Sequence, residues 1–385
     1  MVFMERMGMD MEHYFGEATP KLGFGLMRLP KEASGKIDIE QTKKMVDLFM
    51  RAGLNYFDTA YVYDSGDSER AAKEALVDRY PRESFTLATK LCVWMGAHNE
   101  ETAKQQFYTS LERTGAGYFD YYLLHALQAG NYKTYDKYHI WDFVKEQKAK
   151  GLIRHWGFSF HATPDILDEI LTAHPDAEFV QLQLNYADWE NSDVTARENY
   201  EVARKHGKSI VVMEPVKGGA LADPPEAVRK IFDEADSAAS YASWAIRYAA
   251  SLDGIITVLS GMSNVAQMED NLSYMKNFKA LNGQEQAAVR KAQEAITGIK
   301  SIPCTACHYC TAGCPKKIPI PEIFEARNKQ LVWGQLEEGR AAYEKAVSGA
   351  GSASDCIACG QCERACPQQI NVTERLKDCA GVFGK

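Results

Sequence analysis

Two short cysteine runs in the last quarter of the 385-residue chain constrain its fold more than any other feature of the sequence. Each run has the spacing C-x2-C-x2-C-x3-C and is followed at once by a proline, Pro315 or Pro367. Thiolates at this spacing reach three corners of a [4Fe–4S] cubane from one tight loop. We therefore expect two [4Fe–4S] clusters. The eight cysteines are Cys304, Cys307, Cys310, Cys314, Cys356, Cys359, Cys362 and Cys366.

The fourth cysteine of each run is expected to bind the cluster of the other run, as it does in two-cluster ferredoxins. One cluster is then held by Cys304, Cys307, Cys310 and Cys366, and the other by Cys356, Cys359, Cys362 and Cys314. Zinc and disulfides are the alternatives. Zinc needs four ligands and does not require two identical runs that end in proline, so iron is favoured. Crossed ligation makes the tail one folding unit, which we expect to need iron to fold.

The segment between the two runs predicts a mainly helical tail. Residues 321–347 are typical of about two helices, and a Gly/Ser linker at 348–354 leads into the second run. A helical spacer of this kind resembles the α-helical dicluster ferredoxins rather than the compact bacterial type. We place this domain at 300–385 and the preceding domain at 1–299. Two further cysteines, Cys92 and Cys379, lie outside the pattern and are predicted to be buried thiols.

The first domain alternates β-rich and amphipathic helical segments. Eight strands that alternate with helices over roughly 250 residues predict an α/β fold, a (β/α)8 TIM barrel. A doubly wound sheet is the alternative, but no G-x-G-x-x-G motif follows an early strand. The expected strands are residues 22–29, 55–60, 85–90, 118–126, 153–160, 179–185, 209–215 and 254–260.

Charge and hydropathy narrow the environment and the partners. The formal net charge of −8 argues against a nucleic-acid partner. The N-terminal segment carries charged residues such as Glu5 and Arg6 and has no apolar signal-peptide core. No run of 18 apolar residues occurs, so no membrane span is predicted. We expect a cytoplasmic protein.

Four polar side chains stand at or just after the ends of consecutive predicted strands. Asp58 and Tyr63 follow the second strand, Lys90 ends the third and His125 ends the fourth. Catalytic groups of TIM barrels occupy these positions. A tyrosine can protonate an oxygen if a nearby ammonium lowers its pKa, and a carboxylate can hold that ammonium. A single polar residue at a strand end more often caps a loop, but four in this order favour a catalytic site.

These residues lie in motifs that resemble the aldo-keto reductases over roughly residues 20–280. The motifs are FDTAYVY (57–63), ATK ending at Lys90, DYYLLHA (120–126), GLIRHWGFS (151–159) and SGMSNVAQMEDNL (260–272). The resemblance implies the catalytic tetrad Asp58, Tyr63, Lys90 and His125. Tyr63 would be the general acid, and a nicotinamide cofactor would give its hydride to a carbonyl carbon. Histidine at position 125 resembles the ordinary carbonyl reductases rather than the double-bond-reducing steroid branch.

The resemblance also implies a nucleotide site. Ser159 and Gln181 would hold the carboxamide, although Phe160 replaces the usual asparagine. Several branches place Lys or Arg near the 2′-phosphate. None stands between Ser260 and Asn271, which weakens NADP but leaves NADP and NAD as candidates. Glycines of the 216–220 loop allow a close approach of backbone to phosphate. The implied residues are Gly25, Leu26, Met27, Asp58, Ser159, Gln181, Met213, Glu214, Pro215, Val216, Lys217, Gly218, Gly219, Gly261, Ser263, Gln267, Asp270 and Asn271.

Three functions remain open at this stage. The chain is a carbonyl reductase or alcohol dehydrogenase whose clusters exchange electrons with a ferredoxin or another carrier. Alternatively its clusters are structural or redox-sensing, or its barrel is a non-catalytic part of an electron-transfer protein. Hydride transfer moves two electrons and a cluster moves one, so exchange calls for a switch such as a flavin. A barrel can hold FMN without a signature, but nothing in the sequence supports a flavin. Trp156 and His161 either line the substrate mouth or only pack.

Overall fold

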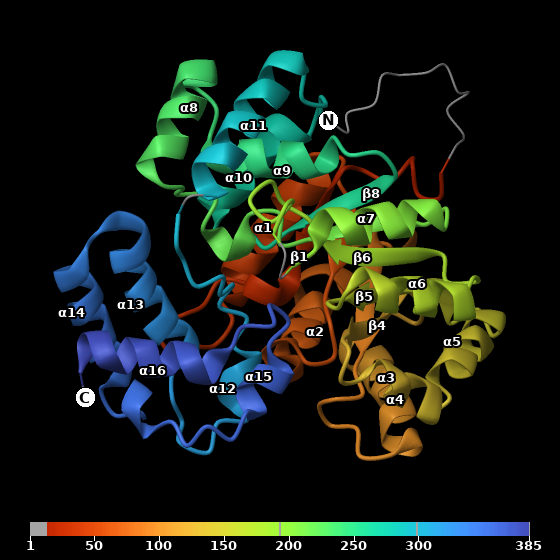
Figure 1. The fold of residues 1–385 in the computed structure, drawn as a ribbon. Coiled ribbons are helices and arrows are strands. Elements are labelled where there is room, and N and C mark those ends of the chain that lie inside the picture. Colours follow the sequence, from red (N-terminus) through yellow and green to blue (C-terminus); the bar gives the residue numbers. More distant parts are fainter. Residues whose placement is uncertain (1–13, 192–193, 298, 385) are drawn as a thin grey trace.

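A computed structural model describes residues 14–191, 194–297 and 299–384. Eight parallel strands form a closed barrel in chain order, with β1 paired to both β2 and β8 (Figure 1). The predicted TIM barrel is confirmed. The strands are β1 Leu22–Gly25, β2 Tyr56–Asp58, β3 Thr86–Leu91, β4 Phe119–Leu127, β5 Ile153–Phe160, β6 Phe179–Gln183, β7 Ser209–Met213 and β8 Ile255–Ser260.

All eight predicted strands are present, but several are shorter than the sequence pattern suggests. The largest difference is in the first, where Leu26–Arg28 form a short 3-10 turn instead of continuing the strand. The last pairs of β1 join Gly25 to Asp58 and Phe24 to Ser260, the final residues of β2 and β8. Beyond Gly25, neither neighbouring strand offers backbone groups that could pair with β1. The strand therefore ends there, although the apolar sequence pattern continues into the turn.

Helices surround the barrel. The first, α1, begins where the Asp38 side chain accepts a hydrogen bond from the amide of Gln41, and it buries Met45 and Phe49 against the strands. The helices of this part are α1 Ile39–Arg51, α2 Asp67–Ala72, α3 Glu100–Thr114, α4 Tyr132–Lys137, α5 Ile140–Ala149, α6 Pro164–Ala173, α7 Ala196–Lys205, α8 Glu226–Asp236, α9 Tyr241–Ala250, α10 Val265–Met275 and α11 Gly283–Thr297.

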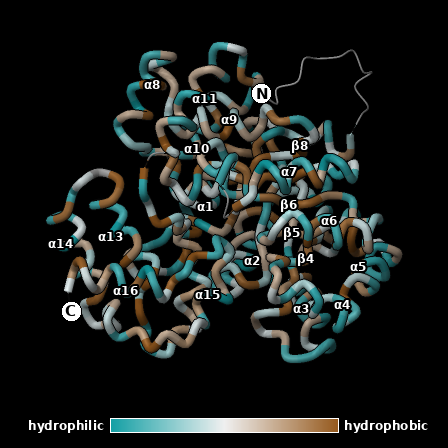
Figure 2. The backbone as a smooth tube through the Cα atoms, in the orientation of Figure 1, coloured by the Kyte–Doolittle hydropathy of each residue, from teal (hydrophilic) through white to brown (hydrophobic). Residues whose placement is uncertain are grey.

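Apolar side chains fill both the inside of the barrel and the layer between strands and helices. Tyr56, Tyr121, Phe179 and Ile256 belong to a small cluster inside the barrel, and a larger cluster lies between strands and helices. Figure 2 shows hydrophobic residues along the central strands and hydrophilic residues on the outer helices. Strands buried on both faces explain why the sequence reads as continuous apolar runs. None of the described helices is long and apolar enough to cross a bilayer.

The C-terminal region is helical and has its own core. The predicted pair of spacer helices is confirmed as α13 and α14, which are separated by Gly334 at a φ of 70°. Phe324, Tyr343 and Leu376 are buried in the core of this region. The proposed boundary between residues 299 and 300 falls between the end of α11 and this core. The helices are α12 Tyr309–Ala312, α13 Ile320–Trp333, α14 Leu336–Val347, α15 Gln361–Ala365 and α16 Val372–Phe383.

The C-terminal region packs on the mouth of the barrel through buried polar contacts. Gln183, at the end of β6, exchanges two hydrogen bonds of 2.9 and 2.7 Å with Gln368, and both side chains are buried. Gln369 donates to the carbonyl of His161 at 3.3 Å. The reciprocal hydrogen bonds between the two buried amides form in only one relative orientation. The C-terminal region therefore packs on the barrel in a specific orientation.

Candidate active site and cluster sites

The barrel brings three of the four predicted catalytic residues together through adjacent strands. Asp58 ends β2, Lys90 lies in β3 and His125 lies in β4. The ammonium of Lys90 is 2.6 Å from a carboxylate oxygen of Asp58 and donates to the carbonyl of Thr59 at 2.7 Å. The Lys90 side chain is fully buried. A buried ammonium needs such partners, so Asp58 and Lys90 act as one charged unit.

Tyr63 reaches the same place through a strained turn rather than a strand. The three residues after it all have positive φ: 47° at Asp64, 56° at Ser65 and 93° at Gly66. Two successive left-handed residues other than glycine are conformationally costly, and strain of this kind often clusters at functional sites. The turn leaves the Tyr63 ring 4.8 Å from the Lys90 nitrogen and 5.7 Å from the His125 ring. All four predicted catalytic residues therefore lie together.

Burial governs the protonation states of these groups. The pKa of Tyr63 is raised well above its ordinary value, first by burial and then by Tyr309, Asp58 and Glu214. The expectation that a nearby ammonium lowers it was wrong, because desolvation outweighs the attraction and only the Arg28 charge acts in the lowering direction. Burial, followed by the charge of Lys90, lowers the pKa of His125 well below its ordinary value. Both side chains are neutral at pH 7.

A pH profile checks these directions. Tyr63 can donate its proton only below its pKa, and His125 is neutral only above its own. With one pKa well above 10 and the other well below 6.5, we expect kcat/KM for carbonyl reduction to be flat from about pH 6.5 to about pH 10. A falling limb centred near pH 8 that disappears in a Tyr63→Phe variant would contradict the raised pKa.

A cavity of about 560 Å³ opens at the carboxyl ends of the strands. It runs from the predicted catalytic residues to the N-terminal ends of α9 and α10, where Ser240 and Asn264 line it. This is a usual size for a small-molecule or cofactor site. The predicted site residues that line the cavity are Gly25, Met27, Asp58, Tyr63, His125, Gln181, Met213, Glu214, Pro215, Val216, Gly218, Gly219, Gly261, Ser263, Gln267, Asp270 and Asn271.

Four predicted site residues lie away from the cavity lining. Leu26 packs in the layer between strands and helices, and Lys90 lies behind Asp58. The Ser159 hydroxyl accepts a hydrogen bond of 2.7 Å from the amide of Ala126, the residue after His125, so it supports the backbone at that point. Lys217 forms an ion pair with the buried carboxylate of Asp188.

Several buried polar atoms of the cavity have no hydrogen-bond partner. They are Oδ2 of Asp58, Nδ1 of His125 and Oε1 of Gln181. Unpaired buried polar atoms are costly, and each is expected to be matched by a ligand group. A free acceptor on Gln181 suits the amide group of a nicotinamide, and a free ring nitrogen on His125 suits a carbonyl oxygen. The donor and acceptor set therefore fits a nicotinamide cofactor and a carbonyl substrate.

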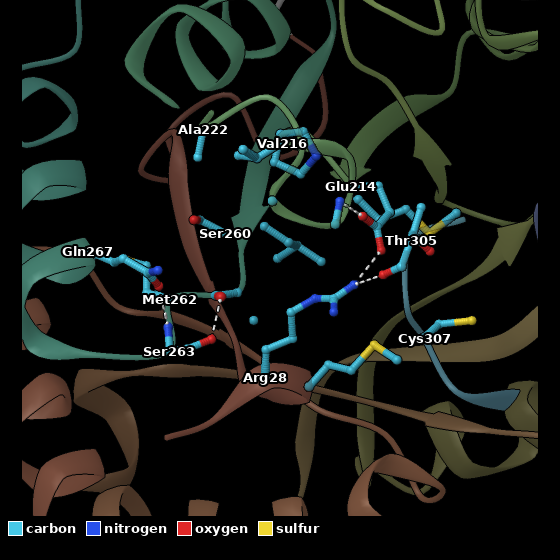
Figure 3. A pocket seen from close by; sticks show the side chains of 18 of the residues that line it. Arg28, Glu214, Val216, Ala222, Ser260, Met262, Ser263, Gln267, Thr305 and Cys307 are labelled. Atoms are coloured by element: carbon cyan, nitrogen blue, oxygen red, sulfur yellow. Dashed lines mark hydrogen bonds and ion pairs between the residues drawn. The ribbon is translucent and has the colours of Figure 1, made fainter. Parts of the chain in front are cut away.

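The cavity wall also contains residues that the sequence analysis missed. Arg28, Thr305, Tyr309 and Gln368 line it, and Arg28 occupies its centre (Figure 3). The signal for Arg28 was available, because it closely follows the end of a barrel strand. No comparable signal marks the other three, which come from the distant C-terminal region. Of the two aromatic or imidazole candidates at the mouth, His161 lines the cavity, whereas Trp156 is 2% exposed and only packs.

Tyr309 closes the substrate end of the cavity from the C-terminal side. Its ring centroid lies 6.3 Å from that of His125 and 5.1 Å from that of Trp94. Trp94 in turn donates to the carbonyl of His125 at 3.3 Å. An aromatic lid from the second region therefore faces the predicted catalytic histidine of the first.

The predicted cluster cysteines surround two further small cavities. Cys304, Cys307, Cys310 and Cys366 line one, and Cys314, Cys356, Cys359 and Cys362 line the other. This is the crossed grouping expected from the spacing. Among the described residues no three metal-binding side chains converge on a single-ion position. Ligands of a cubane bind its separate corners, so the spread of sulfurs around each cavity suits a cluster better than one ion.

The three cavities form a row. The first cluster cavity shares Thr305, Cys307 and Gln368 with the large cavity. The two cluster cavities share Ile320. Beyond them, Cys359 is exposed at the surface, and the next-but-one residue Ile357 is 58% exposed. Shared lining residues thus connect the two cysteine groups with the wall of the candidate active site.

Comparison with known proteins agrees with this architecture. A profile of the aldo/keto reductase family matches residues 21–294, and a profile of the 4Fe-4S dicluster domain matches residues 303–370. An uncharacterised oxidoreductase of Bacillus subtilis, YqkF, is 23% identical over 70% of this chain and 91% of its own length. L-galactose dehydrogenase of Arabidopsis thaliana is 24% identical over 74% of this chain and 93% of its own length.

Solved structures share the barrel. The holo form of an aldo-keto reductase from Bacillus halodurans is 24% identical with a TM-score of 0.56, over 71% of this chain and 91% of its own. An aldo/keto reductase from Klebsiella pneumoniae in complex with NADP and acetate is 18% identical with a TM-score of 0.58, over 71% of this chain and 92% of its own.

Proposed function

The chain belongs to the aldo/keto reductase family, and we propose that it interconverts a carbonyl compound and an alcohol with NAD(P)(H). The observation that carries this proposal is the grouping of Asp58, Tyr63, Lys90 and His125 at the inner end of one cavity. A bound nicotinamide dinucleotide would supply or accept the hydride. A barrel without activity would have no use for the buried Asp58–Lys90 pair and the strained turn at Tyr63, which both cost stability.

Each residue of the tetrad has a separate task. Tyr63 is the general acid in the reductive direction, because its hydroxyl stays protonated at pH 7, although burial raises its pKa and makes it a weaker acid than a free tyrosine. His125, neutral at pH 7, donates a hydrogen bond to the carbonyl oxygen and orients the carbonyl. Lys90 packs 4.8 Å from the Tyr63 ring and its charge helps to keep His125 neutral, and Asp58 holds Lys90 in place. The walls of the cavity exclude water from these groups.

The nucleotide would lie along the cavity toward α9 and α10. Gln181 would accept a hydrogen bond from the carboxamide. The pyrophosphate would meet the 216–219 loop at the amide of Gly218, because the amides of Lys217 and Gly219 already donate to nearby backbone carbonyls. Ser263 and Gln267, at the N-terminal end of α10, would meet the adenosine end. These groups suit a free 2′-hydroxyl, and they offer a 2′-phosphate only neutral donors and the N-terminal end of α10. The proposed cofactor is therefore NADP or NAD.

We further propose that the two cysteine groups hold [4Fe–4S] clusters that exchange electrons with a ferredoxin or a similar carrier. Coupling of the one-electron clusters to the two-electron hydride step would use a flavin or another two-to-one electron switch. The row of cavities supports electron exchange, because Cys307 lines both the first cluster cavity and the candidate active site. Purely structural or redox-sensing clusters are the second candidate. The exposed Cys359 at the outer end favours exchange over a purely structural role, because a structural cluster gains nothing from access to a partner.

One experiment separates the parts of this proposal. The anaerobic holoenzyme receives NADPH or NADH carrying deuterium on C4, with and without a panel of aldehydes, and EPR spectra are recorded. Deuterium on the carbinol carbon of the product demonstrates hydride transfer. Reduced-cluster signals that grow with NAD(P)H and decline when aldehyde is added support electron exchange. Deuterium transfer without any change in the cluster signals would support carbonyl reduction and contradict electron exchange by the clusters.

The contact between the 216–219 loop and the first cysteine run gives a stability prediction. A Cβ on Gly218 would lie 2.7 Å from the carbonyl oxygen of Thr305, whereas a Cβ on Gly219 would meet nothing within 4 Å. Both glycines have positive φ, so alanine costs roughly 1–2 kcal/mol at either. Only Gly218→Ala should also displace the run and speed iron loss to a chelator. Equal rates of iron loss in the two variants would contradict this contact.

A further inference from the structure

Arg28 joins the nucleotide cavity to the first cysteine run. Its guanidinium donates to the carbonyl of Thr305 at 2.7 Å and to that of Ala306 at 3.4 Å. These carbonyls lie between Cys304 and Cys307. The Arg28 side chain also passes Gly261, where a Cβ would come within 3.4 Å of its Cδ. Arg28 therefore spans the cavity from the β8 side to the run, as Figure 3 shows.

The carboxylate of Glu214 binds the same guanidinium from the β7 side. One oxygen accepts from Arg28 at 3.2 Å, and the other accepts from the amide of Gly218 at 2.6 Å. Glu214 has a φ of 54°, an uncommon conformation for a residue other than glycine. The backbone is thus strained to place an anion between an arginine and a loop amide. Such strain is often part of a mechanism.

The Arg28 guanidinium and the Gly218 amide are the two donors that a dinucleotide pyrophosphate would need. Arg28 is the only arginine or lysine among the described residues that line the cavity, while Asp58, Glu214 and Asp270 are acidic. A pyrophosphate carries two negative charges and binds best to a guanidinium and to loop amides. The Glu214 carboxylate, with one negative charge, occupies the place between Arg28 and the Gly218 amide that a pyrophosphate would take.

We propose that Arg28 is a shared anchor for the dinucleotide pyrophosphate and the first cysteine run, with Glu214 as the anion that the pyrophosphate displaces. The guanidinium has five donors, so it can take the phosphate oxygens and keep the Thr305 carbonyl. Occupation of the nucleotide site then tightens the loop that carries Cys304 and Cys307. This inference rests on the nucleotide site of the proposed function and adds a link to the first cluster.

Adenosine diphosphate ribose is the probe, because it carries the pyrophosphate but no nicotinamide ring. Its affinity is measured by calorimetry on the anaerobic holoenzyme and its variants. Arg28→Met should weaken binding roughly tenfold or more, as expected for loss of a charge-assisted hydrogen bond. Glu214→Gln should strengthen binding, because a competing charge is removed. Lys36→Met, which removes an exposed charge on the same loop, should leave binding unchanged.

Iron loss to a chelator measures the link to the cluster. Saturating adenosine diphosphate ribose should slow the release of about half the iron in the unchanged protein and in Lys36→Met. In Arg28→Met, at a probe concentration that still saturates the site, the release rate should not respond. Arg28→Lys keeps the positive charge but loses the planar guanidinium with its several donors. Compared with Arg28→Met, it should recover much of the affinity for the probe but less of the slowing of iron release.

The outcomes separate this inference from the proposed function. If the probe does not bind the unchanged holoenzyme, the nucleotide site itself is wrong. If it binds Arg28→Met as tightly as the unchanged protein, or Glu214→Gln more weakly, the shared anchor is wrong and the reductase remains. Equal slowing of iron loss with and without Arg28 overturns the link to the cluster.

Discussion

Replacing Tyr63 by Phe is expected to lower kcat for carbonyl reduction by roughly 10²- to 10⁴-fold, the usual contribution of a positioned general acid. The hydroxyl is the only part removed, and the ring stays packed 5.7 Å from the His125 ring. Because burial holds the pKa of Tyr63 well above its ordinary value, the lost group is a neutral acid and not a charge. The fold and the cysteine runs should be unaffected.

The measurement is single-turnover reduction of an aldehyde by the holoenzyme, together with iron content and affinity for adenosine diphosphate ribose. Tyr61→Phe is the matched control, because Tyr61 lies two residues away and is absent from the cavity lining. That variant should keep its activity. An active Tyr63→Phe enzyme with normal iron would show that another group supplies the proton, and the tetrad assignment would fail.

Replacing Cys366 by Ser is expected to remove the first cluster and lower kcat/KM for the carbonyl compound roughly tenfold to hundredfold. Cys366 lies with the cysteines of the first run, and their cavity shares Thr305 and Cys307 with the candidate active site. Without the cluster, the first cysteine run can shift, and Thr305 and Cys307 shift with it. Small misplacements of residues around a reaction site lower rates by roughly tenfold to hundredfold. Cys314→Ser should also remove about half the iron, yet it should leave carbonyl reduction intact, because its cavity shares no residue with the active site.

Paired variants test the crossed ligation itself. Cys304→Ser with Cys366→Ser should lose no more iron than either single variant, because both cysteines serve one cluster. Cys304→Ser with Cys314→Ser should lose nearly all of it. Iron analysis and EPR of the reduced proteins give the answer. The opposite pattern would assign each fourth cysteine to its own run, and equal activities of Cys366→Ser and Cys314→Ser would contradict the shared wall.

The features predicted most accurately from sequence are those set by local spacing. The positions of Asp58, Lys90 and His125 follow from the rule that strand ends meet at one face of a barrel, and the structure places them together. The cysteine spacing predicted two groups of four, and the alternation of strands and helices predicted the barrel. These patterns repeat over short distances, so neighbouring residues carry the whole signal.

The sequence pattern was less accurate where strands end and where burial decides protonation. It extended β1 into Leu26–Arg28, because the apolar pattern does not show where the neighbouring strands stop pairing. It also predicted a lowered pKa for Tyr63. Charges of single residues can be read from sequence, but desolvation depends on everything packed around a group, and burial is the largest influence on Tyr63.

The two cysteine runs by themselves predicted two groups of four cysteines, and motif order predicted the candidate catalytic residues of the barrel. Only the tertiary structure decided that the first run forms a wall of the candidate active-site cavity, with Tyr309 facing His125 and Arg28 bound to the Thr305 carbonyl. The physical reason is distance along the chain. Contacts across more than 180 residues depend on how two separately formed cores dock, through pairs such as Gln183 and Gln368 that carry no local pattern.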